Sequence, residues 1–449
     1  MPTSADATVQ SPPRATLPSL DSVELQPSRP RDRLRTLLGS GAGNALEWYD
    51  WNIYAVFAPF FAAQFFNPDN RVAALLSTLA VFAVGFGMRP LGGLLFGWLA
   101  DRHGRRTSML FSVGLACGAS LLIGLAPTYG SIGIAAAAVL LLARLLQGLA
   151  HGGEIAAGHT YVAEIAPPQR RGLWSSVIYV SGMFATLLAV LLGAGLTSVL
   201  SDDAMSSWGW RVPFLVGGAL GLVAIYLRRQ LSETEAFENH DSRAQSGTSR
   251  PSIWRGIWEN RNAALTVVGL TLGGTVFFYT WVVAAPAYAI GVKDMDPTAA
   301  LWASVVAILV MIAALPLAGR LSDRFGRRPN FLIFSLGAAA LSFPLNRLIQ
   351  GEAWQLALAM SIALGLLALV VSILPALFAE LFPTRVRATG IGIPYSVAVA
   401  LTGGTAAYLQ TWLSTNGHGD LFLVYSIVLL LIGAVTILAT PETRGRPLT

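Results

Sequence analysis

The chain has 449 residues, of which 54% are hydrophobic and only 12% are charged, and its mean hydropathy is +0.59. Soluble domains carry about 25% charged residues, so this composition excludes an ordinary soluble globular protein. The formal charge of +6 does not indicate nucleic-acid binding, because the arginines fall in short loops between apolar runs. The only cysteine, Cys117, excludes an internal disulfide and a cysteine-based metal cluster.

Residues 1–37 are rich in Pro, Ser and Ala and lack the hydrophobic segment of a signal peptide. This composition predicts a disordered tail. Basic residues beside a membrane span remain on the cytoplasmic side, so we expect a cytoplasmic N-terminus. Four arginines directly precede the first apolar run: Arg29, Arg31, Arg33 and Arg35.

Apolar runs of roughly 20 residues, enough to cross a ~30 Å hydrocarbon core, follow one another along the rest of the chain. Arginines gather in every second loop between these runs, which predicts that both termini are cytoplasmic. We therefore expect an all-α membrane protein with about twelve transmembrane helices. The expected spans are 38–65, 72–99, 107–127, 132–160, 173–200, 209–228, 264–290, 299–320, 329–349, 354–380, 388–413 and 420–440.

A ten-residue block occurs twice, at 97–106 and 319–328, after the second and the eighth expected span. Such self-similarity predicts a duplicated architecture of two six-helix halves. Glycines in these two gate loops permit close helix contact and tight reversal, and Asp101 would meet the positive N-terminus of the eleventh span. Alternatively, the arginines only set the topology. The candidate gate residues are Gly97, Asp101, Arg102, Gly104, Arg105, Arg106, Gly319, Asp323, Arg324, Gly326, Arg327 and Arg328.

The expected halves are residues 38–228 and 263–440. A polar cytoplasmic linker over 229–262 joins them, and residues 441–449 form a cytoplasmic tail. A second repeated segment closes the fourth and the tenth span, and arginines follow each copy: Glu164-Ile-Ala-Pro167 and Glu380-Leu-Phe-Pro383.

The gate loops resemble the loop signature of the major facilitator superfamily, and residues 144–148 resemble its second signature. Residues 43–50, 89–90, 152–154 and 208–213 are similar to the metabolite:proton symporter family, and residues 227–234, 278–280 and 388–392 to its dicarboxylate carriers. This resemblance implies two six-helix halves around a central site that opens alternately to either face. One departure stands at 284–288, where the carriers' pattern leads us to expect a basic residue and this chain has none.

Two carboxylates, Glu47 and Asp50, lie roughly 14–18 Å into the first span at ~1.5 Å per residue. Charged groups at this depth are costly and usually face the bundle interior. A carboxylate whose proton affinity depends on which face is open can carry a proton across the membrane. We assign both to proton coupling, with Asp50 slightly favoured. The alternative is that Glu47 binds polar groups between helices and never titrates.

The fourth span carries a polar stripe on one helical face, which must look into a cavity or another helix. Its members are Arg144, Gln147, His151 and Glu154. Arg144 can bind a substrate carboxylate through two parallel hydrogen bonds, with Gln147 beside it, and His151 and Glu154 are candidates for proton coupling. Alternatively, Arg144 is permanently paired with Glu47 or Asp50, and His151 is a satisfied polar group.

Arg89 precedes Pro90 in the second span, where a proline kink would present it as a second anion contact. Alternatively, its side chain extends to the membrane interface. Two intramembrane cations in the first half and none in the second favour an anionic substrate, best a dicarboxylate. Tyrosines near these cations either contribute to substrate binding or only pack against neighbouring helices. The further candidates for substrate binding are Asn44, Tyr54, Tyr279 and Tyr395.

These observations predict a secondary transporter of the inner membrane that imports a small organic anion with protons. The resemblance implies α-ketoglutarate or a related di- or tricarboxylate as the substrate, and the other expected partners are protons and the lipid bilayer. We expect a functional monomer that is not an enzyme, with no cofactor, metal or nucleic acid. No Walker pattern supports nucleotide-driven pumping. Alternatives are a proline- or betaine-type zwitterion symporter, an exporter of drug-like compounds and a non-transporting membrane sensor.

Overall fold

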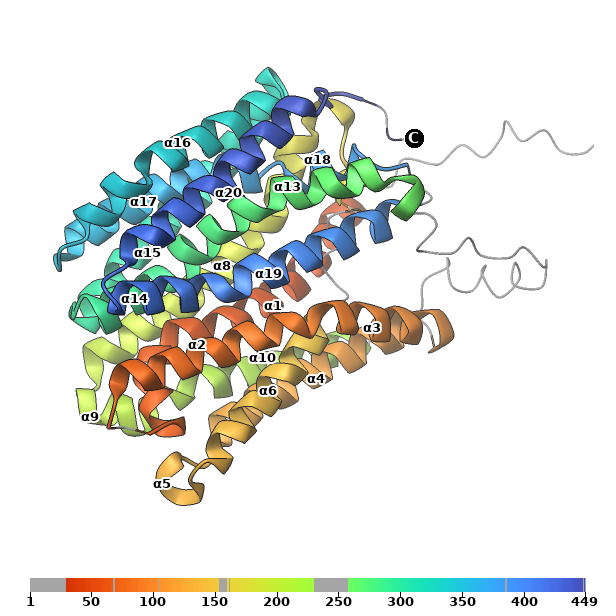
Figure 1. The fold of residues 1–449 in the computed structure, drawn as a ribbon. Helices are drawn as coiled ribbons and strands as arrows, with labels where there is room; N and C mark the ends of the chain where they lie inside the picture. The colour runs from red at the N-terminus through yellow and green to blue at the C-terminus, as the bar shows by residue number, and fades with distance from the viewer. Residues whose placement is uncertain are drawn as a thin grey trace, which may run out of the picture. The chain divides into compact units, whose positions relative to one another are not determined.

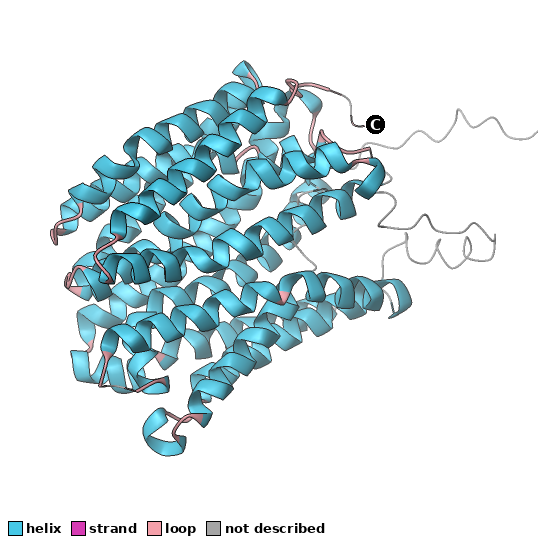
Figure 2. Cartoon of the chain, viewed as in Figure 1, coloured by secondary structure: helices cyan, strands magenta, loops and turns pink. Residues whose placement is uncertain are grey.

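The computed structural model describes residues 30–67, 69–103, 105–152, 160, 162–229, 257–383, 386–446 and 448. The chain divides into two units, residues 1–39 and 40–449, and the arrangement that follows is that of the second unit. The described residues form helices joined by turns and loops, which is an all-α architecture (Figure 2). Residues 1–29 of the expected tail and 230–256 of the expected linker lie outside the described residues.

The first half begins with α1 (Pro30–Phe65), which starts ahead of the expected residue 38. Asn70 caps α2 (Arg71–Gly87) by accepting the Ala73 N–H at 2.9 Å. α2 and α3 (Arg89–His103) form one span that is interrupted at Met88, directly before the expected kink. The other elements are α4 (Arg105–Leu125), α5 (Tyr129–Ile132), α6 (Ala135–His151), η2 (Pro168–Arg170), α8 (Arg171–Val199), α9 (Asp202–Ala204), η3 (Met205–Gly209) and α10 (Arg211–Arg229).

The second half has the same succession of long helices. Its helix α15 starts at Pro297, a residue suited to the first helical position, behind Asp296, which accepts the Ala299 N–H at 2.7 Å. The elements are α13 (Arg261–Phe278), η4 (Tyr279–Ala284), α14 (Ala285–Val292), α15 (Pro297–Phe325), α16 (Arg327–Leu348), α17 (Ala353–Val371), α18 (Leu374–Ala379), α19 (Arg387–Thr415) and α20 (Gly419–Ala439).

Ten segments of the described residues are long and apolar enough to cross a membrane. α6 is a shorter apolar helix, and α1 has 36 residues. Together they match the prediction of about twelve spans, and the predicted all-α membrane fold is confirmed. Figure 1 shows α2, α3, α4 and α6 of the first half on one side of the bundle and α13, α16, α17 and α20 of the second half on the other, with α8 of the first half beside helices of the second half.

Glycines allow α6 to cross α2 and α3 at very short range. A Cβ on Gly148 would lie 2.0 Å from the Gly85 carbonyl oxygen, and one on Gly92 would lie 2.0 Å from the Leu149 carbonyl oxygen. Only glycine can occupy such positions, because any larger residue would force the backbones apart. The crossing therefore brings the backbone of α6 directly against the backbones of α2 and α3.

The two halves meet along α8 and α15 and along α2 and α19. A Cβ on Gly319 would lie 2.7 Å from the Gly172 carbonyl oxygen, so the close contact predicted for Gly319 is a contact between α15 and α8. The gate loops lie at the end of the bundle where α15 ends and α8 begins. We call this end, which carries Arg170, Arg320 and Arg324, the basic end.

Candidate functional site

The Asp50 carboxylate lies in a polar cluster that joins α1, α4 and α6. Its side chain is buried and accepts hydrogen bonds from the Ser120 hydroxyl and, at 2.9 Å, from Gln147 Nε2. Gln147 Nε2 also donates to Ser120 Oγ at 2.9 Å. Among the described residues Asp50 has neutral donors as direct partners and makes no ion pair. Protonation of Asp50 therefore does not have to break a salt bridge.

The Arg144 guanidinium is fully buried and faces aromatic rings of α1 and α2. Its Cζ lies 4.2 Å from the ring centroid of Trp51, 4.2 Å from that of Tyr54 and 4.9 Å from that of Phe82. Ring faces attract a cation, and the attraction is stronger when the site is desolvated. These rings hold the guanidinium at a fixed position without neutralising its charge.

Two donor groups of Arg144 are unsatisfied. Nη1 donates to Gln147 Oε1 at 2.6 Å, whereas the buried Nε and Nη2 have no hydrogen-bond partner. Of the two pairings considered for Arg144, with Glu47 or with Asp50, an ion pair with Asp50 is not found among the described residues. Buried donors without partners are costly, so this arrangement favours an anionic ligand as the missing partner.

Arg89 opens α3 beside the same tryptophan. Its Cζ lies 4.1 Å from the Trp51 centroid and 4.5 Å from the Phe86 centroid, and its Nε has no hydrogen-bond partner. The side chain is buried against these two rings. Two guanidiniums, those of Arg89 and Arg144, therefore contact one indole ring.

The second half supplies an aromatic wall to this site. The hydroxyl of Tyr279, which begins the π-helical turn η4, hydrogen-bonds with Arg89, and its ring meets Phe86 edge-on at 5.1 Å. Tyr395 of α19 hydrogen-bonds with Tyr179 of α8. Single π-helical turns are frequent at functional sites. The two guanidiniums thus lie where the halves meet.

Two of the predicted substrate contacts use their polar groups elsewhere. Asn44 Nδ2 donates to the Ile178 carbonyl at 3.0 Å and to Ser181 Oγ at 2.9 Å, both on α8. The Tyr54 hydroxyl donates to the Thr78 carbonyl of α2 at 2.9 Å. Tyr54 therefore reaches the site through its ring face, and Asn44 joins α1 to α8.

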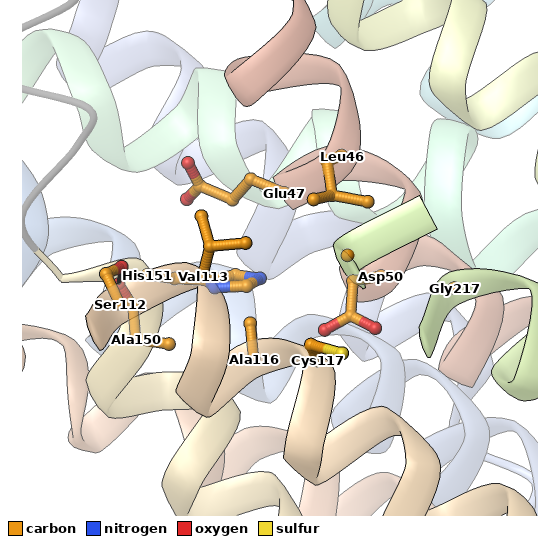
Figure 3. Close-up of a pocket in the computed structure, with 11 residues that line it drawn as sticks. Leu46, Glu47, Asp50, Ser112, Val113, Ala116, Cys117, Ala150, His151 and Gly217 are labelled. Atoms are coloured by element: carbon orange, nitrogen blue, oxygen red, sulfur yellow. Dashed lines mark hydrogen bonds between the residues drawn. The ribbon is translucent and has the colours of Figure 1, made fainter. Parts of the chain in front are cut away.

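A small cavity of about 20 Å³ lies beside Asp50 within the first half. Figure 3 shows the His151 ring directed toward the side where the Asp50 carboxylate and Cys117 lie. Glu154, predicted with these groups, lies outside the described residues. The described residues contain no group of three or more His, Cys, Asp or Glu side chains placed to hold a metal ion. The cavity is lined by Leu46, Glu47, Asp50, Ser112, Val113, Ala116, Cys117, Ala150, His151, Gly217 and Gly221.

Four residues of the site were not predicted: Trp51, Phe82, Phe86 and Ser120. Trp51 carries a usable signal, because a tryptophan deep in an apolar run stands away from the interfaces where tryptophan normally lies. Ser120, Phe82 and Phe86 carry none, since a hydroxyl or a phenyl ring within a span is usually a packing residue. Their roles depend on which helices meet.

At the basic end, the second gate loop contacts the start of α8. Asp323 accepts the backbone N–H groups of Gly172 and Leu173 at 2.8 and 2.9 Å, and Arg327 Nη1 donates to it at 2.9 Å. A carboxylate is stabilised at a helix N-terminus by the unpaired N–H groups and the helix dipole. The sequence predicts this type of contact for Asp101 and the eleventh span, and Asp323 makes it with α8.

Each half supplies the acid for an arginine of the other half. Arg171 Nη1 donates to Glu380 Oε1 at 3.0 Å, and Arg387 Nη1 donates to Glu164 Oε1 at 2.7 Å. The two repeated segments that close spans four and ten are therefore paired crosswise. The side chain of Glu380 is 0% exposed, whereas that of Glu164 is 40% exposed.

Further groups surround Glu380. Arg327 Nη2 lies 3.3 Å from Glu380 Oε1, and the Thr443 hydroxyl donates to Glu380 Oε2 at 2.6 Å. Arg171 Nη1 also donates to the Arg446 carbonyl at 3.0 Å. The segment that follows α20 therefore covers the buried pair.

Glu442 attaches that same segment to the start of α16. Burial alone would raise the pKa of its carboxyl group, but four backbone N–H donors bind the ionised form and bring the pKa below its ordinary value. Gly326, with φ of 111°, makes the reversal predicted for it directly before α16. The donors to Glu442 are the N–H groups of Arg327, Arg328, Thr443 and Arg444.

The other gate residues are placed as follows. Arg102 Cζ lies 5.7 Å from the Trp98 ring, Arg324 Cζ lies 5.3 Å from the Phe325 ring, and Arg328 Nη2 donates to the Leu438 carbonyl at 2.9 Å. Gly104 and the side-chain positions of Gly97, Asp101, Arg105 and Arg106 lie outside the described set.

We expect Glu380→Gln to destabilise the protein, because the buried guanidinium of Arg171 loses its anion and that of Arg327 keeps only Asp323. Removing one partner of a buried ion pair costs about 3–5 kcal/mol. The matched control is Glu164→Gln, whose carboxylate is partly exposed to solvent, so that its loss should destabilise the protein less. Thermal unfolding of the purified variants measures the difference. Equal melting temperatures for the two variants would show that the buried pair is not the stronger one.

Comparisons with known proteins agree with this architecture. The family model described as the Major Facilitator Superfamily matches residues 41–301, and the model described as "Sugar (and other) transporter" matches residues 235–449. The chain is 38% identical over 425 residues to the alpha-ketoglutarate permease of Escherichia coli (strain K12), covering 94% of this chain and 97% of that protein. It is 30% identical over 433 residues to the proline/betaine transporter of Salmonella typhimurium (strain LT2), covering 92% and 84%.

Solved structures share the fold. A D-xylose-proton symporter superposes with a TM-score of 0.67 at 20% identity, covering 92% of this chain and 99% of that chain. A proton:xylose symporter bound to 6-bromo-6-deoxy-D-glucose has a TM-score of 0.74 at 18% identity, covering 92% and 97%. The resemblance predicted from the gate loops is thereby confirmed. The chain belongs to the major facilitator superfamily and is a multi-pass membrane transporter.

Proposed function

We propose that this transporter is a proton-coupled symporter that imports a small organic anion, α-ketoglutarate or a related di- or tricarboxylate. The observation that carries the proposal is the pair of buried guanidiniums on Trp51, with unpartnered Nε and Nη2 on Arg144 and unpartnered Nε on Arg89. A guanidinium binds a carboxylate through parallel, charge-assisted hydrogen bonds. Each of the two guanidiniums can therefore bind one carboxylate of a dianion.

The same geometry disfavours a quaternary ammonium ligand. Recognition of such a cation requires aromatic faces that are open to it. Here the faces of Trp51, Tyr54 and Phe82 are already taken up by Arg144. A betaine headgroup in this place would also meet two positive charges. The proline- or betaine-type function nevertheless stays the second candidate, because the relatives include transporters of that type.

The substrate would be held mainly by the first half. Residues 284–288 of η4 and α14 are Ala-Ala-Pro-Ala-Tyr, so the second half offers no cation at the place where the dicarboxylate carriers' pattern has one. Its contribution near Arg89 is the hydroxyl of Tyr279. A hydroxyl donor can select among carboxylates by the position of an oxo or hydroxyl group.

Asp50 is our candidate for the coupling group. Its direct partners are the neutral Ser120 and Gln147, and Gln147 connects it to Arg144 through Oε1. Substrate bound at Arg144 would therefore change the hydrogen-bond partners of the amide that faces Asp50. The amide of Gln147 thus links substrate binding at Arg144 to protonation of Asp50.

The concentration of arginines at the basic end favours a cytoplasmic position for that end and for both termini. We place the protein in the inner membrane as a functional monomer, since substrate and proton groups lie within one chain. Uptake into proteoliposomes with an imposed pH gradient tests the proposal, with α-ketoglutarate, succinate, citrate, proline and betaine as probes. Accumulation of the dicarboxylates supports it. Accumulation of betaine alone would establish the zwitterion function, and no uptake of any probe would favour the exporter or sensor.

A further inference from the structure

The cavity beside Asp50 lies among α1, α4, α6 and α10, all of them helices of the first half. Its volume of about 20 Å³ is enough for one water molecule. It extends from Asp50 toward the basic end, because Glu47 lies one turn earlier on α1, Ser112 lies near the start of α4, and His151 is the last residue of α6.

His151 presents an unused acceptor to this region. The ring is 3% exposed, and its Nε2 has no hydrogen-bond partner. The backbone of Glu47 is the hydrogen-bond partner of the ring. A backbone carbonyl can only accept a hydrogen bond, so a neutral ring that donates to it from Nδ1 keeps a lone pair on Nε2. Packing 5.3 Å from the Trp51 ring fixes its orientation.

We propose that this cavity holds a water molecule through which Asp50 releases its proton to His151, so that protons leave through the first half, apart from the substrate. The inference rests on the proposed role of Asp50 in proton coupling. In the step, the Asp50 O–H bond breaks, the water passes a proton on, and an N–H bond forms at His151 Nε2. The imidazolium then returns that proton to water at the basic end, beside Glu47.

The charges around this path are unevenly distributed. The guanidiniums of Arg89 on α3 and Arg144 on α6 are the cations close to His151, and Glu47 on α1 is the nearby carboxylate besides Asp50. α4 supplies Ser112 and Cys117, and α10 supplies only glycines to the lining. The nearby cations would shorten the lifetime of a protonated ring, which suits a group that passes a proton on.

Substrate and proton would reach the central cluster from different sides. Gln147 and Ser120 stand between the Asp50 carboxylate and the guanidinium of Arg144 in the chain of hydrogen bonds. The aromatic rings cover the other face of Arg144. A proton can therefore leave Asp50 toward His151 while the substrate still occupies the arginines.

The test compares net uptake with exchange in proteoliposomes that contain the full chain, with α-ketoglutarate and betaine as probes. Exchange of labelled for unlabelled probe needs no net release of protons, whereas accumulation driven by a pH gradient does. We expect His151→Gln to slow gradient-driven uptake at least tenfold and to keep exchange within twofold of the parent. The matched control is His418→Gln, an exposed histidine at the opposite end, which should change neither rate.

A second variant tests the cavity without altering any titratable group. Ala116→Leu fills the space that Ala116 lines, and we expect the same selective loss of gradient-driven uptake, whereas Ala116→Ser should retain it. Unchanged gradient-driven uptake in both His151→Gln and Ala116→Leu would overturn the relay. If Asp50→Asn keeps full accumulation as well as those two variants, the coupling role of Asp50 is wrong. If Asp50→Asn loses accumulation while His151→Gln and Ala116→Leu keep it, Asp50 couples transport to protons and only the relay is wrong.

Discussion

Asp50→Asn is expected to abolish gradient-driven accumulation of substrate while substrate exchange persists. The amide has the shape of the carboxyl group and can still hydrogen-bond with Ser120 and Gln147, so the helices α1, α4 and α6 should keep their packing. It cannot bind and release a proton in this pH range. The variant therefore loses the link between the two fluxes and keeps the substrate site.

The measurement is accumulation of labelled α-ketoglutarate in proteoliposomes with the membrane potential collapsed. One coupled proton can sustain about tenfold accumulation per pH unit, because one unit corresponds to about 1.4 kcal/mol. The parent should approach this limit, and Asp50→Asn should equilibrate without accumulation. Asp420→Asn, at an exposed position on the opposite end, is the matched control. Undiminished accumulation by Asp50→Asn would remove Asp50 from the coupling role.

Arg144→Ala is expected to lower the affinity for a dicarboxylate by at least about 30-fold. Removing one member of a desolvated charge pair costs about 2–5 kcal/mol, and each 1.4 kcal/mol corresponds to about a factor of ten. Arg144→Lys should recover only part of the affinity, because an ammonium group cannot form two parallel hydrogen bonds with a carboxylate.

Equilibrium binding of α-ketoglutarate to the purified protein, by calorimetry, measures this effect separately from transport. Arg71→Ala is the control, since Arg71 is an exposed arginine at the start of α2. Thermal unfolding checks that Arg144→Ala is folded, because the change also removes the cation that Trp51, Tyr54 and Phe82 surround. Parent-like affinity in the alanine variant would mean that Arg144 is a structural residue.

Much of the fold could be predicted because a bilayer restricts the backbone structures that a chain can adopt inside it. Apolar runs of spanning length must be helices, and a repeated loop at half-chain spacing implies a duplicated bundle. The site residues Asp50, Arg144 and Gln147 were predictable for a related reason. Polar groups deep in apolar runs must turn toward each other or toward water, and the structure brings these three into one chain of hydrogen bonds.

The partners of these groups could not be predicted from single spans. Nothing in the sequence shows that Ser120 of the third span meets Asp50 of the first, since that contact depends on how α4 lies against α1. The repeated segments at Glu164 and Glu380 were visible, but their crosswise pairing requires both halves in place. Periodicity reports which face of a helix is polar and not which helix lies opposite.

The two ion pairs that cross between the halves, Glu164–Arg387 and Glu380–Arg171, are unequally buried, so we expect them to separate one after the other when the basic end opens. Water weakens the Glu164–Arg387 pair, which is 40% exposed at the glutamate, and cannot reach the Glu380–Arg171 pair in the same way. Separation should therefore start beside α19, while α8 and α15 stay together and act as the rotation axis. The substrate would then leave along α19, on the side of the molecule where the Glu164–Arg387 pair joins the two halves before opening.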